Sequence, residues 1–455
     1  MTPRLGSGVI VCENDVEQQY RYRFALAVRL AFLILFAVFL SPPAVIAQNA
    51  DLGEMLKVAE RYTVKIRATV NWPVPPDTFG TARGTGFIID KARGWILTNA
   101  HVARRSPGIV EVAFTDEDWI EVERVYIDNV LDIAILKVPV PRLPDDATEA
   151  QLGCNLPLKQ GAGVAAYGHP ANLAFTATRG IISSVRIFGY EEYIQLDAQL
   201  NPGNSGGPLL DIATAEIVGV NTANMPGMPG LGFATPIRHV CPIISLMTAG
   251  KDPTQPHLPV YWVKTGRNET LTIARSFPST PAGDALPTGA TVLGLAGEKP
   301  VASFPDLMTA LRGRTGNVGV TIRKDGVVSD VSVPLVPSQP VMARRMLTLA
   351  GMLIVERNGL DIDYRDEPRL RVEFVKQGEE ASRRGILQWD QIETVGGEAF
   401  STVEALHAWL AKRPPTERIA LMLRRGTGIT PRRIGSEFYR IEVLNSDMKL
   451  LAMRD

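Results

Sequence analysis

Short apolar runs, broken by glycine, proline and asparagine, fill the chain from about Thr81 to Val220. Examples are Gly-Phe-Ile-Ile at 86–89, Trp-Ile-Leu-Thr at 95–98 and Ile-Val-Gly-Val at 217–220. Regularly spaced short strands without long helical stretches are typical of a β-barrel or a β-sandwich. This region therefore predicts a β domain.

The first clear helix pattern follows this region and closes the first domain. Thr235 can cap the helix, Pro236 suits the first helical position, and Gly250 suits its end. The apolar residues that share one face are Val240, Ile243, Ile244 and Met247. Residues 251–259 then contain three prolines and predict a linker.

A degenerate repeat of roughly one hundred residues follows the linker. Residues 303–308 (Ser-Phe-Pro-Asp-Leu-Met) align with 401–406 (Ser-Thr-Val-Glu-Ala-Leu), and each segment carries a capping-box pattern that opens a helix. A strand and a charged turn come after each helix. The repeat predicts two small α+β domains, at 260–338 and 339–450.

The N-terminus has the layout of a signal peptide. Basic residues at 21–23 precede an apolar run at about 30–40, and small residues at 45–47 suit cleavage before Gln48. The run is shorter than the ~20 residues of a membrane-spanning helix. We expect residues 1–47 to be removed after export to the periplasm or cell envelope, with the protease domain at 48–250. Extension of the run back to Phe24 keeps an uncleaved membrane anchor as the alternative.

Composition narrows the functional classes. The 455 residues suggest two to four domains of roughly 100–200 residues each. Lys+Arg and Asp+Glu number 48 each, so no basic field favours nucleic acid. Cys12 would leave with the signal, and Cys154 and Cys241 could form one disulfide. Their spacing does not favour that bond, and we expect two buried thiols.

Residues 201–208 (Asn-Pro-Gly-Asn-Ser-Gly-Gly-Pro) predict a catalytic nucleophile. Glycines on both sides of Ser205 allow a tight turn that aims backbone amides inward. The amides of Gly203 and Ser205, with Asn204 between them, are the expected oxyanion hole. The alternative is a glycine-rich hairpin with an incidental serine.

A serine nucleophile needs a base and a buried acid. Of the five histidines, only His101 stands at the end of a buried strand, at 95–102, and the other four are expected to be structural or solvated. Asp132 stands in the apolar run 130–136, which predicts a strand where an unpaired charge would be costly. His101 is its expected partner.

The order of these residues separates two classes of enzyme. Residues 203–207 also satisfy the G-x-S-x-G pattern of α/β-hydrolases, which run in the order Ser, acid, His. Here the order is His, Asp, Ser, and 208–211 continue as a strand instead of the helix that a nucleophile elbow needs. The esterase alternative is therefore disfavoured.

These motifs resemble those of the HtrA/Deg family of serine proteases. The matching segments are 98–102, 131–136, 179–183 and 197–209. The resemblance implies two six-stranded barrels with the triad between them, no metal and no nucleotide cofactor. It also implies cleavage of unfolded or misfolded proteins outside the cytoplasm by homotrimers, although segment 51–72, which would make the trimer contacts, carries no decisive pattern.

The repeat resembles the PDZ domains of that family, which bind peptide C-termini by adding a strand to a sheet edge. In the second copy the carboxylate-binding loop would be 349–353, with Ala350, Gly351, Met352 and Leu353 as peptide-binding residues. The first copy has lost the aspartate of the equivalent turn, at 286–292, and has no clear carboxylate loop. We expect that copy to be structural or regulatory.

Substrate preference follows from the family's chymotrypsin-type pocket, whose base lies six residues before the nucleophile, at Gln199. The walls would come from Leu200, Asn221, Thr222, Gly232, Phe233 and Ala234. These residues are mostly small or apolar and include no acid, which predicts cleavage after Val, Ala, Ile or Leu. The competing functional class is a non-catalytic PDZ scaffold or holdase, and the intact triad argues against it.

Overall fold

The computed structural model describes residues 52–115, 118–170, 175–189, 191–222, 231–256, 258, 260–265, 268–276, 281–357, 369–426 and 436–453. The predicted signal segment and the cleavage site before Gln48 lie outside these residues. Among the described residues, no helix is both long and apolar enough to cross a membrane.

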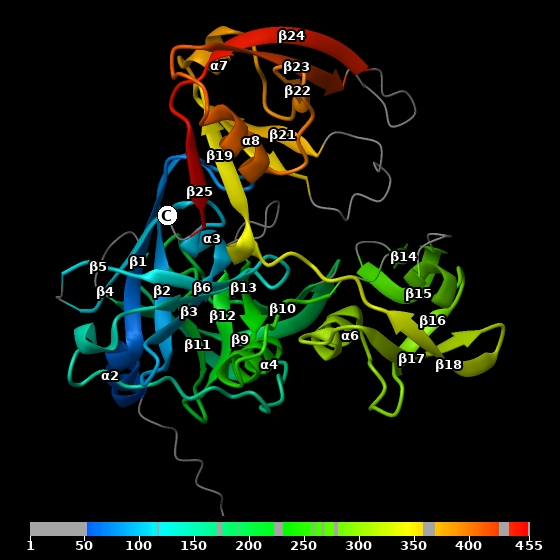
Figure 1. Ribbon diagram of the computed structural model, residues 1–455. Helices are drawn as coiled ribbons and strands as arrows, with labels where there is room; N and C mark the ends of the chain where they lie inside the picture. Colours follow the sequence, from blue (N-terminus) through cyan, green and yellow to red (C-terminus); the bar gives the residue numbers. More distant parts are fainter. Residues whose placement is uncertain are drawn as a thin grey trace, which may run out of the picture. The chain divides into compact units, whose positions relative to one another are not determined.

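Four antiparallel sheets form the described part of the chain (Figure 1), so the prediction of a mainly β fold is confirmed. The first sheet has the order β5-β4-β1-β2-β3-β7-β6. Its strands are β1 (Thr63–Val70), β2 (Gly80–Asp90), β3 (Trp95–Asn99), β4 (Gly108–Ala113), β5 (Ile120–Glu121), β6 (Glu123–Asp128) and β7 (Ile133–Lys137). The second is a closed barrel of six strands. They are β8 (Gly163–Gly168), β9 (Thr176–Phe188), β10 (Glu191–Leu196), β11 (Pro208–Asp211), β12 (Ile217–Thr222) and β13 (Gly232–Pro236).

Two further sheets follow the helix α4 (Ile237–Thr248). The five-stranded sheet consists of β14 (Val260–Thr265), β15 (Asn268–Ser276), β16 (Thr291–Leu295), β17 (Asn317–Lys324) and β18 (Val327–Pro334), with α5 (Pro281–Ala285) and α6 (Phe304–Leu311). The seven-stranded sheet consists of β19 (Arg345–Leu349), β20 (Met352–Glu356), β21 (Leu370–Val375), β22 (Gln391–Val395), β23 (Arg418–Gly426), β24 (Ser436–Leu444) and β25 (Lys449–Ala452), with α7 (Glu380–Arg383) and α8 (Val403–Leu410).

The first sheet departs from the six-stranded barrel that the resemblance implied, because it holds seven strands. Its edge strands β5 and β6 are consecutive in the chain, and Val122 joins them. The Val122 amide donates a hydrogen bond to the Val110 carbonyl at 2.9 Å, which ties this junction to β4. The two edges of the sheet are therefore brought together at one residue.

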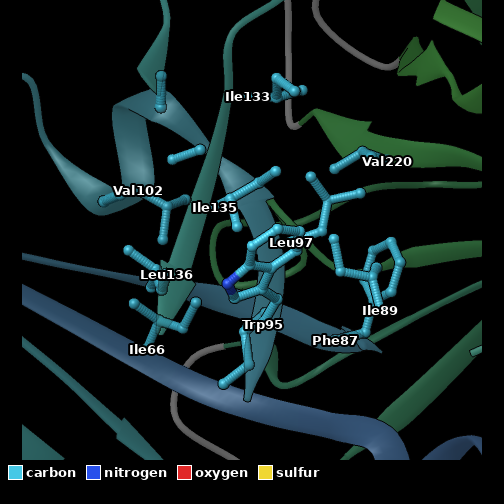
Figure 2. Packing of buried hydrophobic residues seen from close by; sticks show 14 of the residues in the cluster. Ile66, Phe87, Ile89, Trp95, Leu97, Val102, Ile133, Ile135, Leu136 and Val220 are labelled. Carbon is cyan, nitrogen blue, oxygen red and sulfur yellow. The ribbon is translucent and has the colours of Figure 1, made fainter. Parts of the chain in front are cut away.

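The core of the first sheet is a cluster of buried apolar side chains. Figure 2 shows its side chains, and Phe87, Leu97 and Ile135 expose no surface at all. All five residues of β3 are buried, as expected for a central strand with neighbours on both sides. Val220 of β12 joins the same cluster, so side chains of the barrel extend the core of the first sheet. The residues that end β3 and begin β7 therefore have well-defined positions.

The helix α2 (Leu52–Tyr62) lies in the segment where sequence analysis found no decisive pattern. Met55, Ala59 and Tyr62 are its buried residues, at the spacing of one helix face. The helix α4 begins at Ile237, close to the prediction, but Thr235 does not cap it. The Thr235 hydroxyl instead donates to the Leu131 carbonyl, in the turn before β7.

The expectation of two free thiols is wrong, because Cys154 and Cys241 form a disulfide. Their Cα atoms lie 6.0 Å apart although 87 positions separate them in the chain. The bond joins the segment before β8 to α4. Chain spacing carries no information about such a contact, because the fold of the intervening barrel creates it.

The two repeat helices begin at side-chain caps, as predicted. Ser303 accepts a hydrogen bond from the Asp306 amide at the start of α6. In the second copy the cap is Thr402, which accepts from the Ala405 amide, instead of the aligned Ser401. The copies therefore differ by one position in where the helix starts.

A buried ion pair connects the end of α6 to the end of β6. The Arg312 guanidinium lies 2.6 Å from the Asp128 carboxylate, and the two side chains are 2% and 5% exposed. Arg312 also donates to the Tyr126 hydroxyl and to the Pro253 carbonyl. The other oxygen of Asp128 accepts from the amides of Val130 and Leu131, and so shapes the turn before β7.

Replacement of Arg312 by Ala should lower the free energy of unfolding by about 3–5 kcal/mol, because it leaves the buried Asp128 carboxylate without its counter-charge. Chemical denaturation followed by tryptophan fluorescence measures the change. The matched control is Arg314→Ala, two residues further on, whose half-exposed pair with Glu298 should contribute at most ~1 kcal/mol. Equal losses in the two variants would contradict this account.

Candidate active site

The histidine predicted as the base follows β3 directly. β3 ends at Asn99, and His101 lies in the one-turn helix α3 (Ala100–Ala103). Its Nδ1 atom is 2.6 Å from Asp132 Oδ2, and 41% of the imidazole remains exposed. The structure therefore brings His101 and Asp132 together and leaves part of the ring accessible.

Asp132 lies in the turn before β7, with φ of 50°, and not within a strand as predicted. The Ala100 amide and the Asn99 side chain both donate to the Asp132 carbonyl at 3.0 Å. The carbonyl of Asp132 therefore binds the start of α3, while its carboxylate contacts the imidazole. An aspartate tolerates the left-handed conformation better than most residues, which fits its place in this turn.

The Asp132 carboxylate has three donors. Its Oδ1 atom accepts from the His101 amide at 3.0 Å and from the Arg105 guanidinium, while Oδ2 accepts from the imidazole. Burial alone would raise the pKa of this carboxyl. The hydrogen bond and charge of His101, together with the charge of Arg105, instead hold the pKa below its usual range. Asp132 is therefore an ionised partner for the imidazole at neutral pH.

The loop that carries Ser205 packs against β2 and the end of β3. The Thr85 amide donates to the Ser205 carbonyl at 2.8 Å, and the Gly206 amide donates to the Asn221 carbonyl at 2.8 Å. Gly206 has φ of +82°, and a Cβ there would lie 2.2 Å from the Thr98 hydroxyl oxygen. Only glycine fits at position 206. The contacted residue, Thr98, lies in β3 three residues before His101.

The predicted oxyanion hole needs one correction. The Asn204 amide donates to the Asn201 carbonyl at 3.0 Å, so its hydrogen is already used within the loop. The amides of Gly203 and Ser205 stay as the predicted donors. Gly203 has φ of +110°, a conformation that favours glycine.

Thr85 and His169 support this loop, and sequence analysis did not assign them to the site. The Thr85 hydroxyl donates to the Gly203 carbonyl at 2.6 Å and lies 2.8 Å from His169 Nδ1. A hydroxyl has one hydrogen, so the imidazole Nδ1 must be the donor to Thr85. Burial, followed by the charges of Lys65 and Arg83, lowers the pKa of His169 to about 4. A neutral histidine therefore helps to orient the Gly203 peptide.

The predicted substrate pocket is largely closed in this structure. Gln199 is exposed, so it is not a buried pocket base. Asn221, Phe233 and Ala234 expose no surface. The Asn221 side chain donates to the Pro208 carbonyl, and the Phe233 ring packs edge-on against neighbouring aromatic rings. These three residues therefore belong to the barrel interior, which corrects their assignment as walls.

The remaining predicted wall residues have mixed placements. Leu200 is 4% exposed and packs in the second-barrel core. Gly232 is buried beside it, since a Cβ there would lie 3.1 Å from the Leu200 side chain. Thr222 is partly exposed, and its hydroxyl accepts from the Asn99 side chain. Thr222 is therefore the wall residue that the structure leaves open to solvent.

His239 is structural, as expected for a histidine outside the triad. It is 1% exposed and lies 2.9 Å from the Glu192 carboxylate and 3.1 Å from the Thr309 hydroxyl. Arg238 pairs with the same glutamate and with Asp306 of α6. These contacts connect α4 to β10 and α6.

The loop predicted to bind peptide carboxylates in the second repeat is a two-residue hairpin turn. Leu349 of β19 pairs with Met352 of β20, and the Ala350 amide already donates to the Ser446 carbonyl at 2.8 Å. β20 has β19 on one side and β21 on the other. The strand that begins with Met352 and Leu353 therefore has no free edge for a peptide, which corrects the prediction of an open binding edge beside Ala350 and Gly351.

Comparison with known proteins agrees with the geometry of the first two sheets. Residues 84–220 match the family described as trypsin-like peptidase domain. The serine protease named HhoB from Synechocystis is 33% identical over 276 residues, covering 58% of this chain and 64% of that protein. The periplasmic serine endoprotease DegP of Escherichia coli is 27% identical over 370 residues, covering 76% and 75% of the two chains.

Solved structures show the same fold. The HtrA-type protease AlgW, in complex with a tripeptide, aligns with a TM-score of 0.51 and 24% identity over 63% of this chain and 97% of its own. The matches span 64% and 49% of the length of two curated relatives, HhoB and HhoA of Synechocystis. The matched residues 84–220 include the His101–Asp132 pair and the Ser205 loop, so this part of the chain is similar to trypsin-like peptidase domains and to the serine proteases HhoB and DegP.

Proposed function

We propose that this chain is an ATP-independent serine endopeptidase that cleaves unfolded or misfolded proteins outside the cytoplasm. The observation that carries the proposal is the 2.6 Å contact between His101 Nδ1 and the ionised Asp132 carboxylate, with the imidazole 41% exposed. That contact fixes the tautomer in which Nε2 is free to accept a proton. The Ser205 loop packs on Thr98, three residues before His101.

The reaction follows from these roles. His101 Nε2 accepts the proton of the Ser205 hydroxyl as the serine oxygen attacks the scissile carbonyl, and Asp132 stabilises the imidazolium that forms. The amides of Gly203 and Ser205 stabilise the carbonyl oxygen, which becomes an anion. His101 then gives its proton to the leaving amine, and the acyl-enzyme remains. Water, deprotonated by the same histidine, releases the second product and restores Ser205.

The substrate class and compartment rest on the resemblance and on the N-terminal sequence. The DegP relative is named a periplasmic endoprotease, and the N-terminal 47 residues have the layout of an export signal. Homotrimers are the expected assembly on the same ground. The competing proposal, a scaffold or holdase without catalysis, requires a site that cannot form an acyl-enzyme.

Replacement of Ser205 or His101 by Ala should remove nearly all peptidase activity without unfolding the protein, leaving a residual rate of ~10³–10⁴-fold over water. The double variant should be hardly slower than either single variant, because the two residues act as one unit. Digestion of an unfolded model protein, with circular dichroism as the folding check, measures these rates.

Ser245→Ala is the matched control, since Ser245 is an exposed serine on α4 and the variant should digest the substrate normally. A fluorophosphonate probe should label Ser205 in the wild type and nothing in Ser205→Ala. Absence of labelling in the wild type, with unfolded substrate or activating peptide also tried, would favour the scaffold. Losses that multiply in the double variant would contradict the assignment of the triad.

Cleavage should fall mainly after Val, Ala, Ile or Leu. A buried Lys or Arg needs a counter-charge, and none of the predicted pocket residues is acidic. Two side chains that differ by one methylene differ by only ~1–3 kcal/mol in how well an apolar pocket binds them. The preference among these four residues should therefore be broad. Sequencing of the cut sites in an unfolded substrate measures it, and a majority of cuts after Lys or Arg would refute it.

A further inference from the structure

Arg105 makes a contact that the triad itself does not require. Its guanidinium donates to Asp132 Oδ1, the oxygen that does not contact the imidazole ring. The same oxygen accepts from the His101 amide at 3.0 Å. One carboxylate thus lies between a permanent cation and the base that becomes a cation during catalysis.

The surrounding structure holds Arg105 in place. Its amide donates to Asp77 Oδ2 at 2.6 Å, its Nε atom donates to the Asn129 side chain at 3.1 Å, and the residue is 9% exposed. A guanidinium stays charged at every pH at which a protein is folded. Arg105 therefore presents a fixed charge to Asp132, with little screening by solvent.

Two cations that share one carboxylate repel each other. When His101 accepts a proton from Ser205, the imidazolium forms next to the Asp132 carboxylate, whose charge Arg105 already partly neutralises. A like charge nearby disfavours the protonated form of a base. The same repulsion acts in the resting enzyme whenever His101 would accept a proton from acidic solvent.

We infer that Arg105 is a positioning residue that extends the activity of the triad to lower pH. Its charge keeps His101 neutral, and so able to accept the Ser205 proton, at a pH where an isolated Asp–His pair would already be protonated. This inference rests on the proposed peptidase function. It gives a role to one of the two consecutive arginines, Arg104 and Arg105, that follow the histidine motif.

Other charges face this site and must be accounted for. Asp128 of β6 is paired with Arg312, and Asp77 lies 4.0 Å from Arg104, so both carboxylates have cationic partners. Glu191 of β10 is different. Burial first, and then the charges of Asp132 and Asp128, raise its pKa to about 7.

Glu191 is therefore uncharged at acidic pH and becomes an anion above about pH 7. Its ionisation falls within the range in which a histidine base loses its proton. Among the described residues, it is the group at this site whose titration could be mistaken for that of the triad. The test of Arg105 is for this reason carried out with and without Glu191→Gln.

The experiment measures kcat/KM against pH, with one peptide substrate, for the wild type, Arg105→Gln and Arg105→Lys. In Arg105→Gln the acidic limb of the plot of kcat/KM against pH should move to higher pH by about one unit, because a neutral donor replaces the cation. At a pH below the acidic limbs of both profiles, kcat/KM of the variant should be about tenfold lower than that of the wild type. Arg105→Lys restores the charge and should return the limb toward its wild-type position.

Arg104→Gln is the matched control, because Arg104 is the neighbouring arginine and lies beside Asp77 instead of Asp132. The acidic limb of the kcat/KM profile of Arg104→Gln should stay at its wild-type pH. The same shift should appear in the Glu191→Gln background. A loss of rate by one factor at every pH in Arg105→Gln, or equal shifts in the Gln and Lys variants, would overturn the inference and leave Arg105 a structural anchor.

Labelling of Ser205 by a fluorophosphonate provides a second measurement. It requires only a small amount of folded protein and does not require a peptide substrate to bind. The labelling rate depends on neutral His101, so its acidic limb should move in the same direction in Arg105→Gln. The two proposals fail in different ways. A wild type that neither digests substrate nor reacts with the probe would refute the peptidase, whereas a reactive wild type whose limb ignores Arg105 would refute only this inference.

Discussion

The burial of the Asp132 carboxylate is the constraint on which the site depends. A carboxylate that is 17% exposed is costly unless donors surround it, and here the imidazole, the His101 amide and Arg105 all donate to it. These donors come from one short segment after β3. The turn between β6 and β7 must therefore lie against that segment, and the hydrogen bonds from Ala100 and Asn99 to the Asp132 carbonyl hold it there.

The same turn receives support from outside the first sheet and the barrel. Asp128 accepts from the amides of Val130 and Leu131, and its other oxygen is paired with Arg312 after α6. A contact made by the first repeat therefore lies four residues from Asp132, the candidate acid of the triad. The Thr235 hydroxyl adds a bond from the second barrel to the Leu131 carbonyl. Three parts of the chain thus determine the position of one aspartate.

The nucleophile side depends on Thr85 in a similar way. The Thr85 amide donates to the Ser205 carbonyl and its hydroxyl donates to the Gly203 carbonyl, so a single β2 residue orients the peptides that follow Gly203 and Ser205. His169 completes this arrangement as a neutral donor. The aspartate turn and the serine loop are thus both held by backbone carbonyl contacts, which do not depend on the identity of a bound substrate.

The sequence by itself determined the β class, the helix α4 and the identity of the three candidate triad residues, because glycine spacing, strand patterns and the order His, Asp, Ser are local signals. It contained a signal for α2 as well, since Met55, Ala59 and Tyr62 repeat at helical spacing. Only the tertiary structure decided the Cys154–Cys241 disulfide, the roles of Arg105 and Thr85, and the burial of Asn221 and Phe233. Each of these depends on the distance between segments far apart in the chain or on which face of a strand turns inward, and periodicity within one segment does not encode either quantity.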